Sequence, residues 1–245
     1  MLVGAFLLVR WWTTPPPPPP LNSDATQQLV ASITGLPGSE LDQIGAGSAT
    51  NVIRAVSGPA LTGPTGKPEV FYLGAEYCPY CAAERWPMII ALSRFGTFTG
   101  LQTTSSSSTD VFPNTPTFTF RKASYSSQYI DFQSVETTDR NQNALQSPTS
   151  AQEALVTRYD SNGYIPFLDF ANRYAFNGAM YQPDVLSGMS WQAVADALQQ
   201  PGSTQAKAVL GSANLITAAV CRLTGEQPDA VCSAPSIQAI EKAIH

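Results

Sequence analysis

The sequence predicts an α/β protein in which a central mixed sheet is flanked by helices. Residues 70–74 form a compact run of β-branched and aromatic side chains, which is typical of a buried central strand. Segments with apolar side chains at helical spacing follow this run and recur up to the C-terminus. The chain has 245 residues, 43% of them hydrophobic, so it has enough apolar material for a packed core.

The composition excludes several classes of function. Lys and Arg number only 13 and the formal net charge is −5, so no basic stretch could neutralise a row of phosphates. The single histidine is the terminal His245, which removes Ser-His-Asp triads, Cys-His catalytic pairs and most zinc sites. We therefore expect no nucleic-acid partner, no bound metal and no cofactor.

The N-terminus has features of a membrane segment. Residues 2–9 are apolar or glycine, and the tryptophan pair at 11–12 is of a type that favours the lipid–water boundary. A helix of twelve residues would reach only about 18 Å, whereas a bilayer core is roughly 30 Å thick. We interpret residues 1–12 as the remnant of a truncated membrane anchor. A degenerate signal peptide and a plain surface segment remain alternatives.

The anchor interpretation sets the predicted domain organisation. Six prolines at 15–20 form a semi-rigid spacer, so residues 13–21 are predicted to be a proline-rich linker. Residues 22–245 are predicted to be a single domain, held at the cell membrane on the extracytoplasmic side.

Helices and strands are predicted in alternation along this domain. A short helix over residues 22–35 can be capped by Asn22 or Ser23, and residues 40–68 are rich in Gly and Pro, which indicates a helical turn followed by loop. After the strand at 70–74, helical spacing begins at residue 82 and continues to residue 95.

The second half of the domain contains further strands, a polar β-rich insertion and extra C-terminal helices. Strands are predicted at 98–104, 117–121, 129–135 and 164–170, with 174–180 as a hairpin partner of the last. Residues 122–127 are predicted to form a turn. Helices are predicted at 151–159, from Ser190 onward, at 207–223 and at 236–244.

The strongest functional signal is the pair Cys78 and Cys81, separated by Pro79-Tyr80, between the predicted central strand and the following helix. This order of elements puts Cys78 at a helix N-terminus, where the helix dipole and free N–H groups stabilise a thiolate. Cys78 would be the nucleophile, and Cys81 would resolve the mixed disulfide. A zinc site and an inert structural disulfide are the alternatives, but zinc would need a second half that the sequence does not provide.

These residues also carry a family resemblance. Residues 74–86, the segment 163–167 with Ile165-Pro166, and the C-terminal pair Cys221 and Cys232 resemble the thioredoxin-like family catalogued as domain of unknown function 929. The resemblance covers residues 50–235 and implies a thioredoxin-like fold, often behind a membrane anchor. It also implies a cis peptide bond at Pro166, which with Ile165 would face the dithiol and orient the substrate. The Pro79-Tyr80 dipeptide is similar to that of glutaredoxins, so Tyr80 is a further candidate for substrate contact.

The remaining candidates each have two interpretations. Cys221 and Cys232 are separated by a short loop, so we expect a structural disulfide, with an electron-relay pair as the alternative. Glu76 and Glu84 flank the dithiol and could tune or deprotonate the thiols, although such residues are more often solvated or capping.

Together these observations predict an extracytoplasmic thiol-disulfide oxidoreductase whose partners are exported protein thiols and disulfides. The alternative is a catalytically inert accessory subunit or assembly factor of a membrane protein complex, in which Cys78 and Cys81 form a staple. A metallochaperone that binds copper or zinc through the two cysteines is a third hypothesis. An exposed Cys78 sulfur beside Pro166 would favour the enzyme, and a Cys78 covered by loops of the same chain would favour the accessory subunit.

Overall fold

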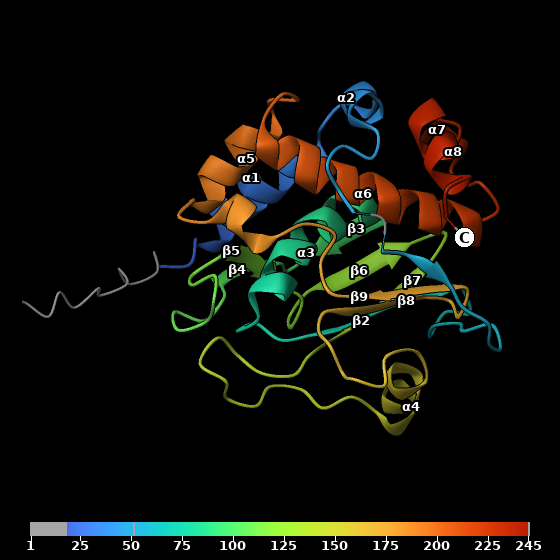
Figure 1. The fold of residues 1–245 in the computed structure, drawn as a ribbon, viewed down its shortest axis with the longest axis horizontal. Coiled ribbons are helices and arrows are strands. Elements are labelled where there is room, and N and C mark those ends of the chain that lie inside the picture. The colour runs from blue at the N-terminus through green and yellow to red at the C-terminus, as the bar shows by residue number, and fades with distance from the viewer. Residues whose placement is uncertain (1–18, 51, 245) are drawn as a thin grey trace, which may run out of the picture.

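The protein is a mixed α/β structure built on a five-stranded sheet (Figure 1). The computed structural model describes residues 19–50 and 52–244. The predicted anchor, residues 1–12, and most of the predicted linker lie outside the described residues. The strands of the sheet, in spatial order, are β1 (Arg54–Ala55), β9 (Tyr174–Asn177), β8 (Phe167–Phe170), β2 (Glu69–Gly74) and β7 (Asp131–Glu136).

Strand β2 occupies the interior of this sheet. It runs parallel to β7 and antiparallel to β8, and all six of its residues are buried. Because side chains alternate across a strand, Tyr72 belongs to the large core cluster on one face and Phe71 to a smaller cluster on the other. Burial on both faces explains why this strand is an unbroken apolar run in the sequence.

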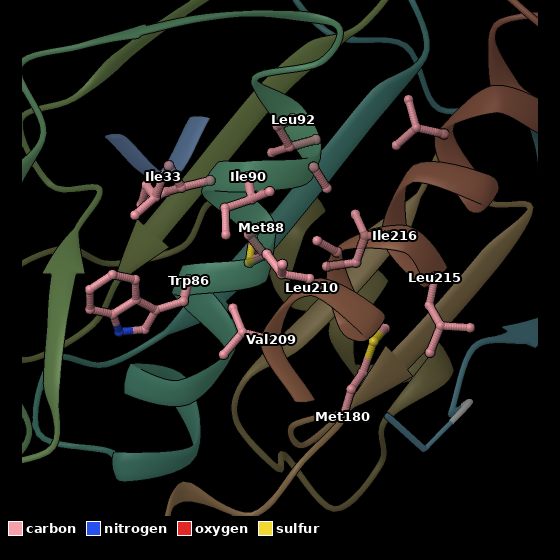
Figure 2. Close-up of a cluster of buried hydrophobic side chains, with 14 of the residues drawn as sticks. Ile33, Trp86, Met88, Ile90, Leu92, Met180, Val209, Leu210, Leu215 and Ile216 are labelled. Atoms are coloured by element: carbon pink, nitrogen blue, oxygen red, sulfur yellow. The ribbon is translucent and has the colours of Figure 1, made fainter. Parts of the chain in front are cut away.

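Helices α3 (Pro79–Leu92) and α6 (Thr204–Leu223) pack against each other on the face of Tyr72 (Figure 1). Figure 2 shows their apolar side chains meeting in one cluster, among them Trp86 and Ile216. Helices α1 (Ser23–Thr34) and α5 (Trp191–Leu198) extend the same layer. Both begin where the sequence predicts, because Asn22 and Ser190 accept hydrogen bonds from first-turn amides.

The remaining helices are short. Helix α4 (Ser150–Tyr159) lies on the opposite face of the sheet, and the side chain of Thr149 and that of Gln152 form a reciprocal capping box at its start. The others are α2 (Gly38–Ile44), the 3-10 turn η1 (Pro183–Leu186), α7 (Asp229–Cys232) and α8 (Pro235–Glu241).

The polar insertion forms two small antiparallel sheets of two strands each, β3 (Gly96–Thr99) with β6 (Ser124–Ser127) and β4 (Gln102–Ser105) with β5 (Pro116–Thr119). The single strand predicted at 98–104 is therefore wrong. The chain turns at Gly100, whose φ of 74° is left-handed, and its two halves pair with different partners.

The turn predicted at 122–127 is also wrong in part, because residues 124–127 form β6. Tyr125 packs its ring against Phe98 and donates its hydroxyl to the Leu92 carbonyl at 2.9 Å. Tertiary contacts of this kind override the weak strand propensity of a serine-rich segment.

Among the described residues, one helix is long and apolar enough to cross a bilayer, namely α6, and 83% of its most apolar window is buried inside the protein.

Candidate dithiol site

Cys78 is the N-cap residue of α3, directly after the turn that follows β2. Its Sγ accepts a hydrogen bond from the backbone N–H of Cys81 at 3.3 Å, and Pro79 occupies the first helical turn. Proline suits this position because its missing N–H would have had no partner inside the helix. Cys78 and Cys81 are both free thiols.

A second segment, at the start of a strand of the central sheet, lies beside the dithiol. The Ile165–Pro166 peptide bond immediately before β8 is cis, as predicted, and the carbonyl oxygen of Ile165 lies 3.8 Å from Cys78 Sγ. The structure thus brings together residues that are 87 positions apart in the chain.

Cys78 and its neighbours are largely covered. Cys78 is 6% exposed and Cys81 is fully buried. A loop at residues 106–114 packs against the residues beside Cys78: its Ser107 N–H donates to the Tyr77 carbonyl at 2.9 Å. The ring of Phe112 meets Tyr80 edge-on at 6.0 Å between centroids, so Tyr80 contacts this loop as well as adjoining the thiols.

The two thiols differ in their acidity. A hydrogen bond from the Cys81 side chain lowers the pKa of Cys78, burial opposes that effect, and the Cys81 backbone amide and the Arg85 charge lower it further. Burial raises the pKa of Cys81 well above its ordinary value. This asymmetry suits one thiol that attacks and a second that is held protonated until it is needed.

The charged group at the dithiol is Arg85, which the sequence analysis did not identify. Its guanidinium is fully buried and binds Glu136 of β7 through two hydrogen bonds of 2.8 and 2.6 Å. It also donates to the Ala75 carbonyl at 2.9 Å, in the turn that leads to Cys78. One signal could have revealed it: Arg85 stands four residues after Cys81, on the same helix face, in a stretch whose other residues, apart from Glu84, are apolar.

Among the described residues, two buried hydrogen-bond donors close to the dithiol have no partner. These are the hydroxyl of Tyr72 and Nη1 of Arg85, and the Arg85 guanidinium lies 5.7 Å from the centre of the Tyr72 ring. A Cβ on Gly74 would lie 2.1 Å from the Tyr72 hydroxyl and 3.1 Å from Cys81 Sγ. Glycine is required at position 74 because this hydroxyl and this sulfur both border the space that a side chain there would fill.

The acidic residues that flank the motif lie elsewhere. Glu84 is fully buried, and its carboxylate accepts a hydrogen bond from the Met180 N–H at 3.0 Å. Burial raises the pKa of Glu84 to about 8. Within the described residues, no hydrogen bond joins Glu84 or Glu76 to either thiol.

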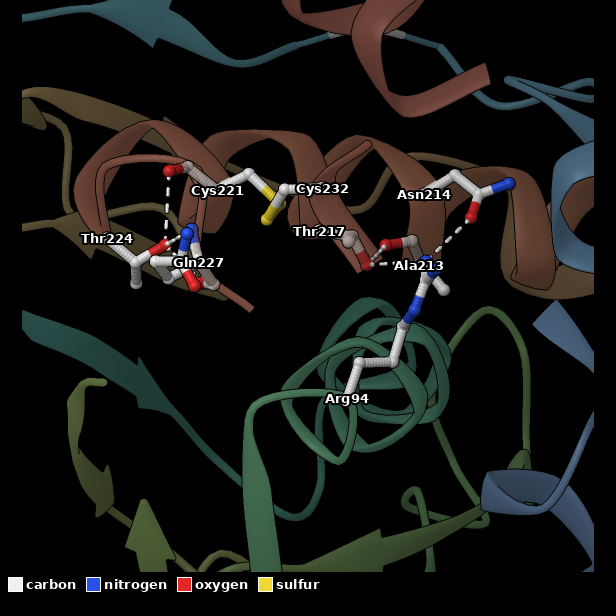
Figure 3. Close-up of a disulfide and its surroundings, with 8 residues drawn as sticks. All are labelled: Arg94, Ala213, Asn214, Thr217, Cys221, Thr224, Gln227 and Cys232. Carbon is white, nitrogen blue, oxygen red and sulfur yellow. Dashed lines mark hydrogen bonds between the residues drawn. A yellow bond between two sulfur atoms is a disulfide. The ribbon is translucent and has the colours of Figure 1, made fainter. Parts of the chain in front are cut away.

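The second cysteine pair forms a disulfide. Cys221, in the last turn of α6, is bonded to Cys232 of α7, with their Cα atoms 5.6 Å apart (Figure 3). Both residues are buried. The Thr224 hydroxyl donates to the Cys221 carbonyl, so the loop inside the bridge is also held by a hydrogen bond. The predicted disulfide is thus present, in a position where its sulfur atoms have little access to solvent.

Comparison with known proteins yields one match. A family described as Domain of unknown function (DUF929) matches residues 55–222. No curated protein sequence and no solved structure matches the chain.

Proposed function

The chain belongs to the family described as Domain of unknown function (DUF929), and we propose that this member is a thioredoxin-like thiol-disulfide oxidoreductase acting outside the cytoplasm. One observation carries the proposal: Cys78 Sγ lies at a helix N-terminus, 3.3 Å from the Cys81 amide and 3.8 Å from the carbonyl that precedes a cis proline. A free dithiol with this asymmetry of pKa has the two roles that exchange requires.

The proposed reaction exchanges two electrons between two dithiol-disulfide pairs. The Cys78 thiolate attacks one sulfur of a substrate disulfide, the substrate S–S bond breaks, and one substrate sulfur leaves as a thiolate. The Cys81 thiol gives up its proton and attacks Cys78 Sγ, which releases the second substrate sulfur and leaves a Cys78–Cys81 disulfide. The reverse sequence oxidises a substrate dithiol. The relative reduction potentials of the two pairs set the direction.

Arg85 and Tyr72 support the resolving step. When Cys81 loses its proton, a negative charge develops in a site without solvent, where an uncompensated charge is costly. The partnerless Tyr72 hydroxyl and Arg85 Nη1 are both donors, and a thiolate is the acceptor that they lack. In this proposal they stabilise the Cys81 thiolate while it attacks.

The substrate would bind beside Ile165 and Pro166. Among the described residues, the large apolar side chains that are most exposed are Val111, at 71%, and Tyr164, at 61%. Val111 lies in the loop that packs beside the dithiol, and Tyr164 directly precedes Ile165. An unfolded exported protein offers apolar segments of the kind that such side chains contact.

The reduction potential of the Cys78–Cys81 pair tests the proposal. Equilibration with glutathione should give a value between about −270 and −120 mV, the range of enzymes that exchange disulfides. Cys78→Ser should abolish exchange in an insulin-reduction assay. A potential well below about −300 mV, together with negligible exchange, would instead indicate a structural staple.

One observation favours a second function, a catalytically inert accessory subunit of a membrane complex. Cys78 is only 6% exposed, and the loop that carries Val111 contacts the neighbouring Tyr77 and Tyr80. The Arg140 side chain holds that loop by donating to the Ser106 carbonyl at 3.1 Å and to Asn114 at 2.9 Å. If the loop never opens, a substrate disulfide has no path to Cys78. The reduction potential of the Cys78–Cys81 pair and its rate of disulfide exchange, determined as described above, would separate the two functions.

A further inference from the structure

The face of the sheet that carries α4 has a cavity with no role in the chemistry proposed above. Its volume is about 580 Å³, and its walls include Leu61, Gln133, Leu155 and Arg158, with Glu69 and Asn172 at the sheet. Helix α4 contributes no fully buried side chain, so it covers this face of the sheet loosely (Figure 1).

The floor of the cavity carries a carboxyl group without a partner. The side chain of Glu69 makes no hydrogen bond within the described part of the chain, although the residue is only 9% exposed. Burial, then the charges of Asp169 and Asp131, raise the pKa of Glu69 to about 7. All three effects act in the same direction.

Two further acceptors adjoin this carboxyl and also lack donors. The Asn172 side chain donates its Nδ2 to the Pro59 carbonyl at 2.7 Å, which fixes its orientation and leaves Oδ1 buried without a partner. Oδ2 of Asp169, a residue with no exposed surface, is likewise unpartnered. Buried acceptors without donors cost free energy, so native proteins almost always satisfy them.

Two cations of the same chain lie near this gap, and neither forms an ion pair with Glu69 in the described part of the chain. Arg158 of α4 lines the cavity, but its side chain is exposed and its guanidinium lies over the Tyr159 ring, 6.0 Å from the centroid. Lys67 donates to the Thr65 hydroxyl, and that hydroxyl donates in turn to Asp131. Within residues 19–50 and 52–244, no Lys or Arg lies within ion-pair distance of Glu69.

We propose that this cavity binds an organic cation with several N–H donors, a primary ammonium or guanidinium group, seated between Glu69 and Asn172, with Asp169 buried behind them. Such a group brings the positive charge and the donors that the two lining acceptors lack, and the apolar Leu61 and Leu155 would contact its carbon chain. A divalent metal fits less well, since the described residues contain no cluster of three or more acidic, His or Cys ligands. The site is independent of the dithiol.

Titration calorimetry with two probes tests the site and its source of ligand. Agmatine represents a free metabolite, and a short end-blocked peptide containing one arginine represents the side chain of a protein partner. Binding of either probe supports the proposal, and whichever binds at least tenfold more tightly identifies the source. For that probe, affinity should rise from pH 6 to pH 8, because the cation prefers the ionised form of Glu69, and binding at pH 7 should release protons into the buffer.

Two variants and a matched control complete the test. Glu69→Gln keeps the shape of the side chain and should weaken binding at least tenfold, whereas Glu153→Gln, on the exposed side of α4, should leave it unchanged. Gln133→Lys should also weaken binding, since its ammonium would occupy the cavity, and it keeps the test decisive if the Glu69 variant fails to fold. Absence of binding of both probes to the unmodified protein, or equal binding by Glu69→Gln, would overturn the proposal.

Discussion

The two cysteine pairs of this protein lie at opposite ends of two helices that pack against each other. Cys78 and Cys81 begin α3, where the unpaired N–H groups and the positive end of the dipole favour a thiolate. Cys221 stands in the last turn of α6, where the negative end of the helix dipole disfavours one. The first pair is reduced and the second is a disulfide.

The surroundings increase this contrast. A buried guanidinium and a partnerless tyrosine hydroxyl adjoin the first pair. The second pair is buried in the apolar cluster between α6 and α8. Arg222, which follows Cys221, donates to the Tyr174 hydroxyl and the Glu241 carbonyl, and Arg94, drawn in Figure 3, donates to Asn214 and Thr217. If the proposed function holds, helix end and local charge distinguish the pair that exchanges disulfides from the structural pair.

Removing each cysteine pair in turn tests most directly which of them carries disulfide exchange. Cys78→Ser should reduce disulfide exchange by at least about a thousandfold, because a hydroxyl is not a nucleophile under these conditions. The double variant Cys221→Ser with Cys232→Ser should retain the exchange rate per folded molecule. Insulin reduction, normalised to the folded fraction from circular dichroism, measures both. If only the double variant loses exchange, the exchange reaction belongs to Cys221 and Cys232, and the proposed roles of the two pairs are wrong.

The next largest effect concerns the buried cation. Arg85→Met leaves the Glu136 carboxylate buried without its partner, which should cost about 3–5 kcal/mol of unfolding free energy. The double variant Arg85→Met with Glu136→Met should recover most of that loss. Urea denaturation measures stability in both. If the double variant is stable but its Cys78 thiol titrates at a higher pH than in the unmodified protein, the arginine acts on the thiols and not only on the fold.

Loss of the second cysteine pair should lower the unfolding free energy more than loss of Cys78 does. Opening the Cys221–Cys232 bridge, whose partners are 11 residues apart, should cost about 3 kcal/mol by loop entropy. Cys78→Ser should cost less, because that residue is in no bridge and lies at the edge of the core. Urea denaturation of the two variants gives the comparison, and equal losses would contradict the division of roles.

Part of this arrangement can be predicted from the sequence. The apolar run at 70–74, the Cys-x-x-Cys at the start of the next helix and the helix caps at Asn22 and Ser190 are local patterns, and the structure agrees with each. The boundary of α6 was predicted less well, since its helix begins at Thr204 and not at 207, one turn earlier, behind the Ser203 cap.

Pairings across the chain could not be predicted in this way. The partner of Arg85 is Glu136, 51 residues further on, and it reaches the dithiol only because β7 lies parallel to β2. The hydroxyl of Tyr72 has no sequence signal at all, since an aromatic residue in an apolar strand is usually a core residue. The β6 strand and the acceptors beneath α4 likewise depend on tertiary contacts.

The smallest expected effect is also the most specific to the dithiol. Tyr72→Phe removes a buried hydroxyl that has no partner, so unfolding free energy should stay the same or rise slightly. The matched change Tyr181→Phe removes a hydroxyl that donates to the Ala83 carbonyl at 2.7 Å and should cost about 1 kcal/mol. The difference in unfolding free energy between the two variants, measured by urea denaturation, shows which hydroxyl forms a hydrogen bond in the resting protein.

The reactivity of the two variants completes that contrast. Alkylation of Cys78 should titrate below its ordinary pKa of 9.0 in both variants, because the hydrogen bonds to Cys78 are unchanged. The resolving step should respond only to Tyr72→Phe: without the donor, the pKa of Cys81 rises further, and release of the second thiol from a mixed disulfide shifts to higher pH and slows about tenfold at neutral pH. Stopped-flow release of a chromogenic thiol measures this step. An equal response of both tyrosine variants would mean that Tyr72 fills space beside the dithiol and does not stabilise its thiolate.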